Sequence, residues 1–149
     1  VIEHEHVIDV SEYAKIIAPY FQTFVEVHKE YKISKMKIVE AWINYMTAGE
    51  YNPVHVHDNC NLSSVLFIKV PKGLKEENDK LKKLKPNVAG PGVLSFMYGE
   101  MAPFNCINRS FFPEEGQLFI FTNVLRHCVY PFTCKGERIS IAANAILEE

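Results

Sequence analysis

Short runs of β-branched and aromatic residues dominate the chain from residue 37 onward. Breaks that contain glycine or proline separate these runs, a pattern typical of strands in an all-β protein. We expect six or more strands, which together form a β-sandwich or barrel over about residues 37–147. The runs that predict them are KIVEAWINYM, SSVLFIKV, GVLSFMY, NCINRSFF, GQLFIFTNV and RISIAANAIL.

Residues 9–32 have a different pattern, in which apolar side chains recur at steps of three and four residues. This spacing predicts one face of a helix. The predicted face comprises Tyr13, Ile17, Tyr20, Phe21, Phe24, His28 and Tyr31. We expect Ser11 to cap the N-terminus and Pro19 to divide the stretch into a short helix and a longer one. His28 is expected to pack in the core, and both helices to cover one face of the sheet.

One charged segment, residues 72–86, interrupts the β-rich region. Its sequence, KGLKEENDKLKKLKP, predicts a solvated insertion between two strands. The alternative is one or two helical turns, because Leu74, Leu81 and Leu84 share a rough face. With no repeat or second pattern in its 149 residues, the chain is most simply a single domain, 1–149.

Composition and charge exclude some partners. The formal net charge of −2 gives no electrostatic reason to expect binding of nucleic acid or of a membrane surface. The apolar runs are too short to span a bilayer, and we expect no secretory signal in the first ten residues. The four cysteines form no CxxC pair, which is typical of reduced thiols in an intracellular protein. We therefore expect a cytoplasmic protein.

Candidate chemistry begins at residues 51–57, which read YNPVHVH. Side chains two positions apart in a strand point to the same face, so His55 and His57 are expected to project together. Such a pair alone is weak evidence for a metal site. Its weight rises because a later strand is followed by His127, and the strand after that presents Arg138 and Ser140 on one face.

A second pair of the same kind, His4 and His6, lies near the N-terminus. No residues downstream match this pair in a comparable order. We expect it to lie in a flexible, solvated tail.

In this order of residues the chain resembles the iron(II)- and 2-oxoglutarate-dependent oxygenases. The fuller pattern is W-x-N-Y-M, G-x-Y-x-P-x-H-x-H, LSSVLFI, G-x-L-x-x-F, H-x-V-x-P and R-x-S-I-A-x-N. It looks especially like a compact family of 2-oxoglutarate/Fe(II) oxygenases from marine bacteria and their phages. The resemblance covers about residues 38–146 and implies a mainly β fold, the double-stranded β-helix or jelly roll.

The resemblance implies a set of metal ligands. His55, His57 and His127 would hold Fe(II) and leave positions for 2-oxoglutarate and O2. Most of the superfamily has a carboxylate where this chain has His57, although the compact family itself has His-x-His. Asp58 is the alternative carboxylate, but strand alternation points it away from the other ligands.

The resemblance also implies a 2-oxoglutarate site. Arg138 would anchor the distant carboxylate, for which a planar guanidinium is well suited, and Ser140 would donate a further hydrogen bond. Asn44, on the strand before the histidine pair, would contact 2-oxoglutarate or else satisfy backbone groups of the sheet. Tyr51 would line the pocket or cap the turn, and Trp42 is expected in the core.

Together these residues predict a dioxygenase that hydroxylates a C–H bond and releases succinate and CO2. A likeness to prolyl hydroxylases suggests a peptidyl or amino-acid substrate, with residues 72–86 as a candidate substrate loop. Two alternatives remain open: a cupin-like three-histidine dioxygenase that needs no 2-oxoglutarate, and a jelly-roll binding module without catalytic activity.

Overall fold

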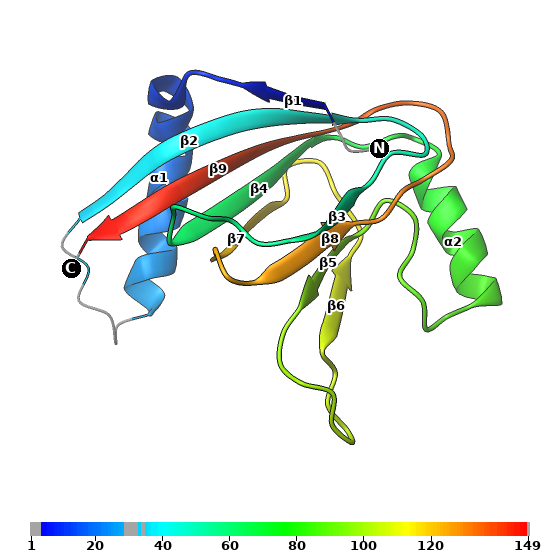
Figure 1. Cartoon of the computed structure of the whole chain (residues 1–149). Helices are drawn as coiled ribbons and strands as arrows, with labels where there is room; N and C mark the ends of the chain where they lie inside the picture. The colour runs from blue at the N-terminus through cyan, green and yellow to red at the C-terminus, as the bar shows by residue number, and fades with distance from the viewer. Residues whose placement is uncertain (1–3, 29–32, 34, 149) are drawn as a thin grey trace.

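The computed structural model describes residues 4–28, 33 and 35–148, and it is built mainly of strands (Figure 1). All six strands expected from the apolar runs are present, and three short strands accompany them. The strands are β1 (His4–Val7), β2 (Lys35–Met46), β3 (Asn52–His55), β4 (Leu62–Lys69), β5 (Leu94–Met97), β6 (Asn108–Phe111), β7 (Leu118–Thr122), β8 (Arg126–Val129) and β9 (Arg138–Glu148). The helices are α1 (Val10–Val27) and α2 (Leu74–Leu84).

The strands form two antiparallel sheets. The order is β1-β2-β9-β4-β7 in the major sheet and β3-β8-β5-β6 in the minor sheet. Most neighbours in space are distant in sequence: β2 pairs along nearly its whole length with β9, and β3 pairs with β8. This arrangement is that of a double-stranded β-helix, so the predicted jelly-roll fold is confirmed.

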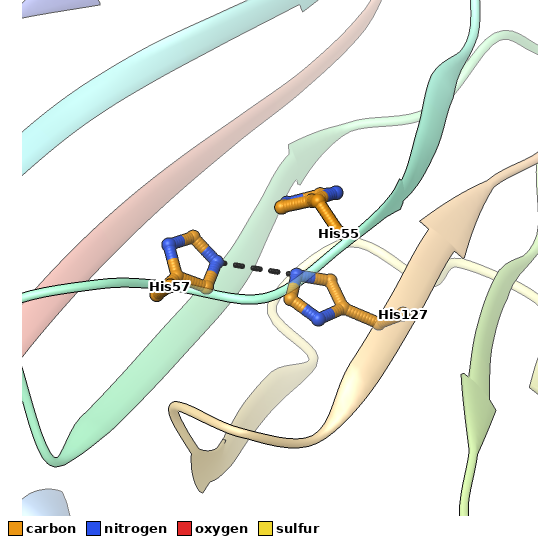
Figure 2. Close-up of side chains that lie close together, drawn as sticks. All are labelled: His55, His57 and His127. Atoms are coloured by element: carbon orange, nitrogen blue, oxygen red, sulfur yellow. Dashed lines mark hydrogen bonds between the residues drawn. The ribbon is translucent and has the colours of Figure 1, made fainter.

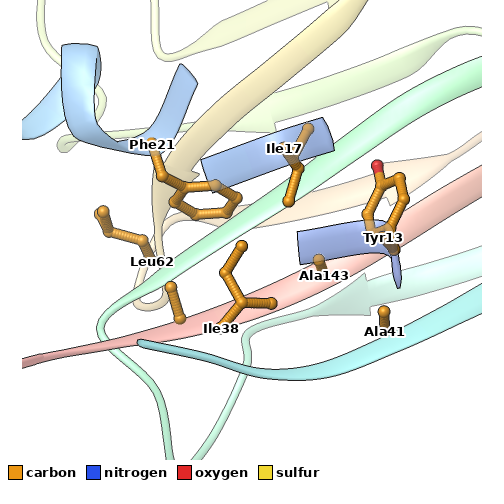
Figure 3. Packing of buried hydrophobic residues seen from close by; sticks show 8 residues of the cluster. Tyr13, Ile17, Phe21, Ile38, Ala41, Leu62 and Ala143 are labelled. Carbon is orange, nitrogen blue, oxygen red and sulfur yellow. The ribbon is translucent and has the colours of Figure 1, made fainter. Parts of the chain in front are cut away.

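Helix α1 covers the outer face of the major sheet (Figure 3). Tyr13, Ile17 and Phe21 of the helix are buried against the sheet, as their spacing predicts. Small alanines on the strands let the helix approach closely. The strand residues of this cluster are Ile38, Ala41, Leu62, Ala143 and Ala145. Tyr20 was wrongly placed on this face, since its side chain is 57% exposed.

Helix α1 differs from the prediction at its start and its middle. Asp9 is the N-cap instead of Ser11, and its carboxylate accepts hydrogen bonds from the Ser11 amide (2.8 Å) and hydroxyl (2.7 Å). The helix also runs through Pro19 without a break. Pro19 removes one amide donor, whose partner would be the Lys15 carbonyl. Both residues lie on the solvent side, where water can satisfy that carbonyl.

The predicted helix boundary and the core role of His28 are also wrong. Helix α1 ends at Val27, and His28 follows it as an exposed C-cap. The Nδ1–H of His28 donates to the Phe24 carbonyl (2.7 Å), and the two rings pack 4.5 Å apart. The remainder of the predicted stretch, residues 29–32 with Tyr31, lies outside the described residues.

The expected N-terminal tail is in fact a strand. β1 pairs with β2 and extends the major sheet by one strand. Its histidines are solvated as expected, but His4 Nε2 lies 3.1 Å from Glu50 Oε1. The prediction failed because four residues carry little periodicity, and the partner strand begins about thirty residues later.

Residues 72–86 are an insertion between β4 and β5 whose charged side chains are mostly exposed, as expected, but the insertion is built on helix α2, in line with the helical alternative. Leu74 is fully buried, and Glu77 accepts hydrogen bonds from the backbone amides of Thr133 (2.9 Å) and Cys134 (2.9 Å). These two anchors tie the helix to the loop before β9, a long-range contact that charge density could not reveal. Neither described helix is long and apolar enough to cross a membrane. The four cysteines are free thiols, as expected.

Candidate functional site

Three histidines meet between the two sheets, although 70 residues separate His57 from His127 (Figure 2). His55 ends β3, His57 follows it by two residues, and His127 lies in β8, directly opposite His55. Their candidate ligand atoms all lie within 4.8 Å of one another. Within the described residues, Asp58 is not part of this cluster, and its side chain is exposed.

Backbone carbonyls fix the tautomers of two of the rings. The Nδ1 atom of His55 lies 2.7 Å from the Pro53 carbonyl, and that of His127 lies 2.8 Å from the Leu125 carbonyl. A carbonyl can only accept, so both Nδ1 atoms carry the proton. Each Nε2 atom therefore presents a lone pair toward the cluster, and such an outer hydrogen bond is the usual support of a metal-bound histidine.

Burial keeps two of the imidazoles neutral. Burial, together with a smaller effect of charge on His55, lowers the pKa of His57 to about 4. Burial likewise lowers the pKa of His127 to about 4, against the opposing effect of its hydrogen bond to Leu125. A neutral ring is the form that binds a metal. The His57 and His127 Nε2 atoms lie only 3.2 Å apart, so both atoms could bind the same cation.

A buried polar pocket adjoins the histidines. Arg138 and Ser140 lie on the inner face of β9, each 2% exposed, and Asn44 lies opposite Ser140 on β2. The three histidines and these three residues line one cavity of about 50 Å³. The sequence prediction that Arg138 and Ser140 share a face, and that Asn44 points inward, agrees with this arrangement.

Neighbouring side chains hold Arg138 in place. Its Nη1 donates to Met46 Sδ (3.2 Å), and its guanidinium carbon lies 4.7 Å above the ring centre of Phe67. These contacts favour one orientation of a buried cation, which can attract an anion in a medium of low dielectric. Within the described residues, the buried Oδ1 of Asn44 has no hydrogen-bond partner, which indicates room for a polar ligand at this end.

Trp42 and Phe121 both line the site, although the sequence predicted a core position for Trp42 and no role for Phe121. Trp42 is half-buried and its ring lies 5.9 Å from His57, so it lines the site and is not a core residue. Phe121 packs 4.7 Å from His127. Alternation along β7 could have placed Phe121 inward, but the sequence offers no partner for it. Tyr51 is 41% exposed and does not line the cavity.

A second polar cluster on the inner face was missed altogether. Ser63 donates to Asn144 Oδ1 (2.7 Å), and Asn144 Nδ2 donates to Glu40 Oε2 (3.1 Å). Asn144 is 4% exposed and Ser63 is 1% exposed. The R-x-S-I-A-x-N pattern includes this asparagine, and its spacing of four from Ser140 places both on the same face.

Solved structures with the same fold support the topology. The chain aligns with the viral collagen prolyl hydroxylase vCPH of Paramecium Bursaria Chlorella virus-1 at 14% identity (TM-score 0.66), covering 99% of this chain and 81% of that one. It aligns with a Pseudomonas putida prolyl-4-hydroxylase at 15% identity (TM-score 0.64), covering 100% and 75%. At such identities the likeness establishes the fold alone.

A third structure is larger than this chain. It is a 2OG-Fe(II) oxygenase family oxidoreductase from Burkholderia pseudomallei, aligned at 15% identity with a TM-score of 0.53. The alignment covers 78% of this chain, which spans only 47% of that protein. No curated protein matches the sequence of this chain.

A family model gives the most direct comparison. The family described as "Putative 2OG-Fe(II) oxygenase" matches residues 40–144, which is well over half of the chain. The match includes the three histidines, Arg138 and Ser140. The chain belongs to this family of 2-oxoglutarate/Fe(II) oxygenases.

Proposed function

We propose that this protein is an Fe(II)- and 2-oxoglutarate-dependent dioxygenase that hydroxylates a C–H bond of a peptidyl or amino-acid substrate, with release of succinate and CO2. One observation carries the proposal. A single cavity is lined by three clustered imidazoles and by a buried arginine. One small ligand could therefore bind a metal held by the imidazoles and, through an anionic group, the guanidinium of Arg138.

The residues present fit a divalent iron. His55, His57 and His127 would supply three neutral nitrogen ligands from one side, as a non-haem iron site requires. When bound, Fe(II) would bind the 2-oxo acid and O2 and supply the oxidation chemistry. Neutral ligands leave the full charge of +2 on the metal, which a doubly negative co-substrate would offset.

The remaining residues orient the co-substrate. Arg138 would hold the distant carboxylate of 2-oxoglutarate in a bidentate contact, already aligned by Met46 and Phe67. Ser140 would donate its hydroxyl to the same carboxylate. Asn44 lies beside Ser140 and would add an amide contact, for which its side chain can present either the oxygen or the nitrogen.

The aromatic residues limit water around the histidines. Trp42 packs against His57, and Phe121 packs against His127. Low water content strengthens the interaction between Arg138 and an anion and protects reactive species from side reactions.

The three-histidine cupin-like dioxygenase has one observation in its favour, namely that none of the three clustered ligands is a carboxylate. Such an enzyme binds no 2-oxoglutarate and therefore does not require a buried arginine in the cavity. Arg138, which is 2% exposed, therefore favours the 2-oxoglutarate enzyme.

The substrate class rests on the named relatives. The proteins of similar fold include a viral collagen prolyl hydroxylase and a bacterial prolyl-4-hydroxylase. We extend from them only the general class, an amino-acid residue that is free or within a peptide.

Anaerobic titration of the protein with Fe(II), with and without 2-oxoglutarate, tests the proposal. A metal-to-ligand charge-transfer band in the visible region is expected only when both are present, and succinate should form once O2 is admitted. Iron binding without any response to 2-oxoglutarate would favour the three-histidine alternative. No iron binding at all would favour a binding module.

A further inference from the structure

A second and much larger cleft opens between β6 and β7. It has a volume of about 630 Å³, within the range typical of ligand sites. Both strands lie at the ends of their sheets, so each has one long side without a partner strand in the described chain. Residues from both faces of β7, Ile120 as well as Phe119 and Phe121, line the cleft, which therefore passes along the free side of that strand.

The floor of the cleft is a group of packed aromatic rings. Phe111 lies 4.9 Å from Phe119, and Phe96 lies 5.0 Å from Phe121. Phe121 also lines the smaller cavity and lies 4.7 Å from His127. The apolar floor therefore continues to the histidine cluster, as expected of a path by which a substrate reaches the metal.

One cation stands at the rim of this apolar floor. Arg109 lines the cleft from β6, directly opposite Phe96, and its side chain is exposed. No carboxylate of the described residues forms an ion pair with it. Arg109 and Phe111 are two positions apart on β6, so their side chains project from the same face about 7 Å apart.

The hairpin that joins β5 and β6 adds an apolar wall. It extends beyond the rest of the minor sheet (Figure 1), and three of its large apolar residues are highly exposed. These are Tyr98 (81%), Met101 (88%) and Phe104 (110%). Tyr98 also lines the cleft. Such exposure beside a cleft favours contact with a partner over a purely structural role.

We infer that this cleft binds an extended peptide substrate in which an acidic residue lies two positions from an aromatic or large aliphatic residue. The inference rests on the proposed function and names the substrate class for that site. A peptide that pairs with a free strand side has the same two-residue period as β6. Its acidic residue would then meet Arg109 while its apolar residue meets Phe111 and the ring cluster.

A peptide fits this cleft better than a small carboxylic acid does. The cleft is bordered by strand sides that have no partner strand in the described chain and can bond a peptide backbone, and it extends from the aromatic floor to the base of the hairpin at Tyr98 and Asn105. Both features would be left unused by a single ring with one carboxylate.

The test uses fluorescein-labelled Gly/Ser/Thr peptides and fluorescence anisotropy. The peptides contain Phe-Thr-Glu, Glu-Thr-Phe, Phe-Thr-Lys or Ser-Thr-Glu at their centre. Binding is measured on protein as purified and on protein supplied with Fe(II) and 2-oxoglutarate, without O2. The Phe-Thr-Glu peptide, the Glu-Thr-Phe peptide or both should bind at least fivefold more tightly than the Phe-Thr-Lys and Ser-Thr-Glu peptides.

Two variants test whether Arg109 causes the preference for an acidic peptide. Arg109→Gln should weaken binding of the preferred peptide at least fivefold and leave the Phe-Thr-Lys peptide unaffected. Arg126→Gln is the matched control, because Arg126 is an exposed arginine of β8 that does not line the cleft. It should change binding less than twofold.

Two results would overturn the inference. One is equal binding of the glutamate and lysine peptides. The other is that free 4-phenylbutyrate displaces the labelled preferred peptide at the same concentration as the unlabelled peptide does. That result would indicate that the occupant is a small carboxylic acid. The expected binding pattern supports the inference whether or not succinate forms. A missing response to 2-oxoglutarate in the separate titration would count only against the proposed function.

Discussion

The two faces of the major sheet are built from alternate residues of the same strands, yet their chemistry is opposite. On β9 the outward residues Ile141, Ala143 and Ala145 belong to the apolar layer beneath α1. The inward residues of the same strand are Arg138, Ser140, Ala142 and Asn144. A shift of one residue in register would exchange the two sets, so the pairing of β9 with β2 and β4 determines both the core and the site.

The outer face contributes stability and little else. Its cluster is apolar, and three helix side chains, at positions 13, 17 and 21, are almost fully buried there. The inner face carries polar groups that cost free energy to bury unless they form hydrogen bonds. At one end the cost is offset internally, because Ser63, Asn144 and Glu40 bond to one another.

The other end of the inner face lines the cavity beside the histidines. Arg138 and Ser140 are almost fully buried there, and Asn44 retains an acceptor without a partner in the described chain. We therefore expect that stability and chemistry can be changed separately in this sheet. Substitutions on the outer face should alter unfolding without altering the site, and those at the ligand end should do the reverse.

The largest effect is expected on the outer face. Phe21→Ala removes a ring that is 0% exposed and should lower the free energy of unfolding by about 3–5 kcal/mol. Denaturant unfolding followed by circular dichroism measures this loss. If the variant does not fold, Phe21→Leu should lose less stability and report the same trend. In whichever variant folds, the 2-oxoglutarate affinity of the iron-loaded protein should remain within twofold of wild type. A large change in that affinity would contradict the separation of the two faces.

The corresponding change on the inner face is Arg138→Met. Loss of a charge-assisted contact in a buried pocket costs about 2–5 kcal/mol, or roughly thirtyfold to several thousandfold in affinity. The 2-oxoglutarate concentration for half-maximal binding should therefore rise at least about thirtyfold, measured by the charge-transfer band or by succinate formation. Methionine keeps much of the aliphatic packing, so stability and Fe(II) binding should hardly change. Unchanged 2-oxoglutarate affinity would remove Arg138 from the site.

The metal ligands should give the next largest effect. His127→Ala, and likewise His55→Ala or His57→Ala, should lower Fe(II) affinity by an order of magnitude or more, because each removes one of three clustered nitrogens. Anaerobic titration or calorimetry measures the affinity. His4→Ala is the control, since His4 lies in β1 and contacts Glu50. An equal loss from His4→Ala would mean that the metal site is elsewhere.

Sequence alone predicted the parts of this molecule that depend on local alternation. The six long apolar runs became strands, and the spacing of Arg138 from Ser140, and of His55 from His57, placed each pair together. The buried helical face was also visible at positions 13, 17 and 21.

Several of the failures share a physical cause, which is contact between segments distant in sequence. Helix α2 is anchored by Glu77 at Thr133, and β1 exists because β2 accepts it. The Glu40–Asn144 contact joins residues 104 positions apart, so no local pattern could indicate it. The prediction that Pro19 divides the helix failed for a different reason. Packing of the flanking turns against the sheet outweighs the one hydrogen bond that the proline removes.

The smallest effects are expected where the carboxylate question is tested, just beyond β3. Asp58 is exposed and lies outside the described histidine cluster, so Asp58→Ala should change Fe(II) affinity less than about twofold. His57→Asp should keep iron binding, because it introduces the His-x-Asp arrangement common in the superfamily. It also replaces a neutral ligand by an anion, which lowers the net charge of the loaded site. Both variants are compared with wild type in the same anaerobic titration, with His57→Ala as the reference for loss of a ligand. If Asp58→Ala abolishes binding while His57→Ala does not, then the third ligand is Asp58, and the inward position of His57 serves packing against Trp42 instead.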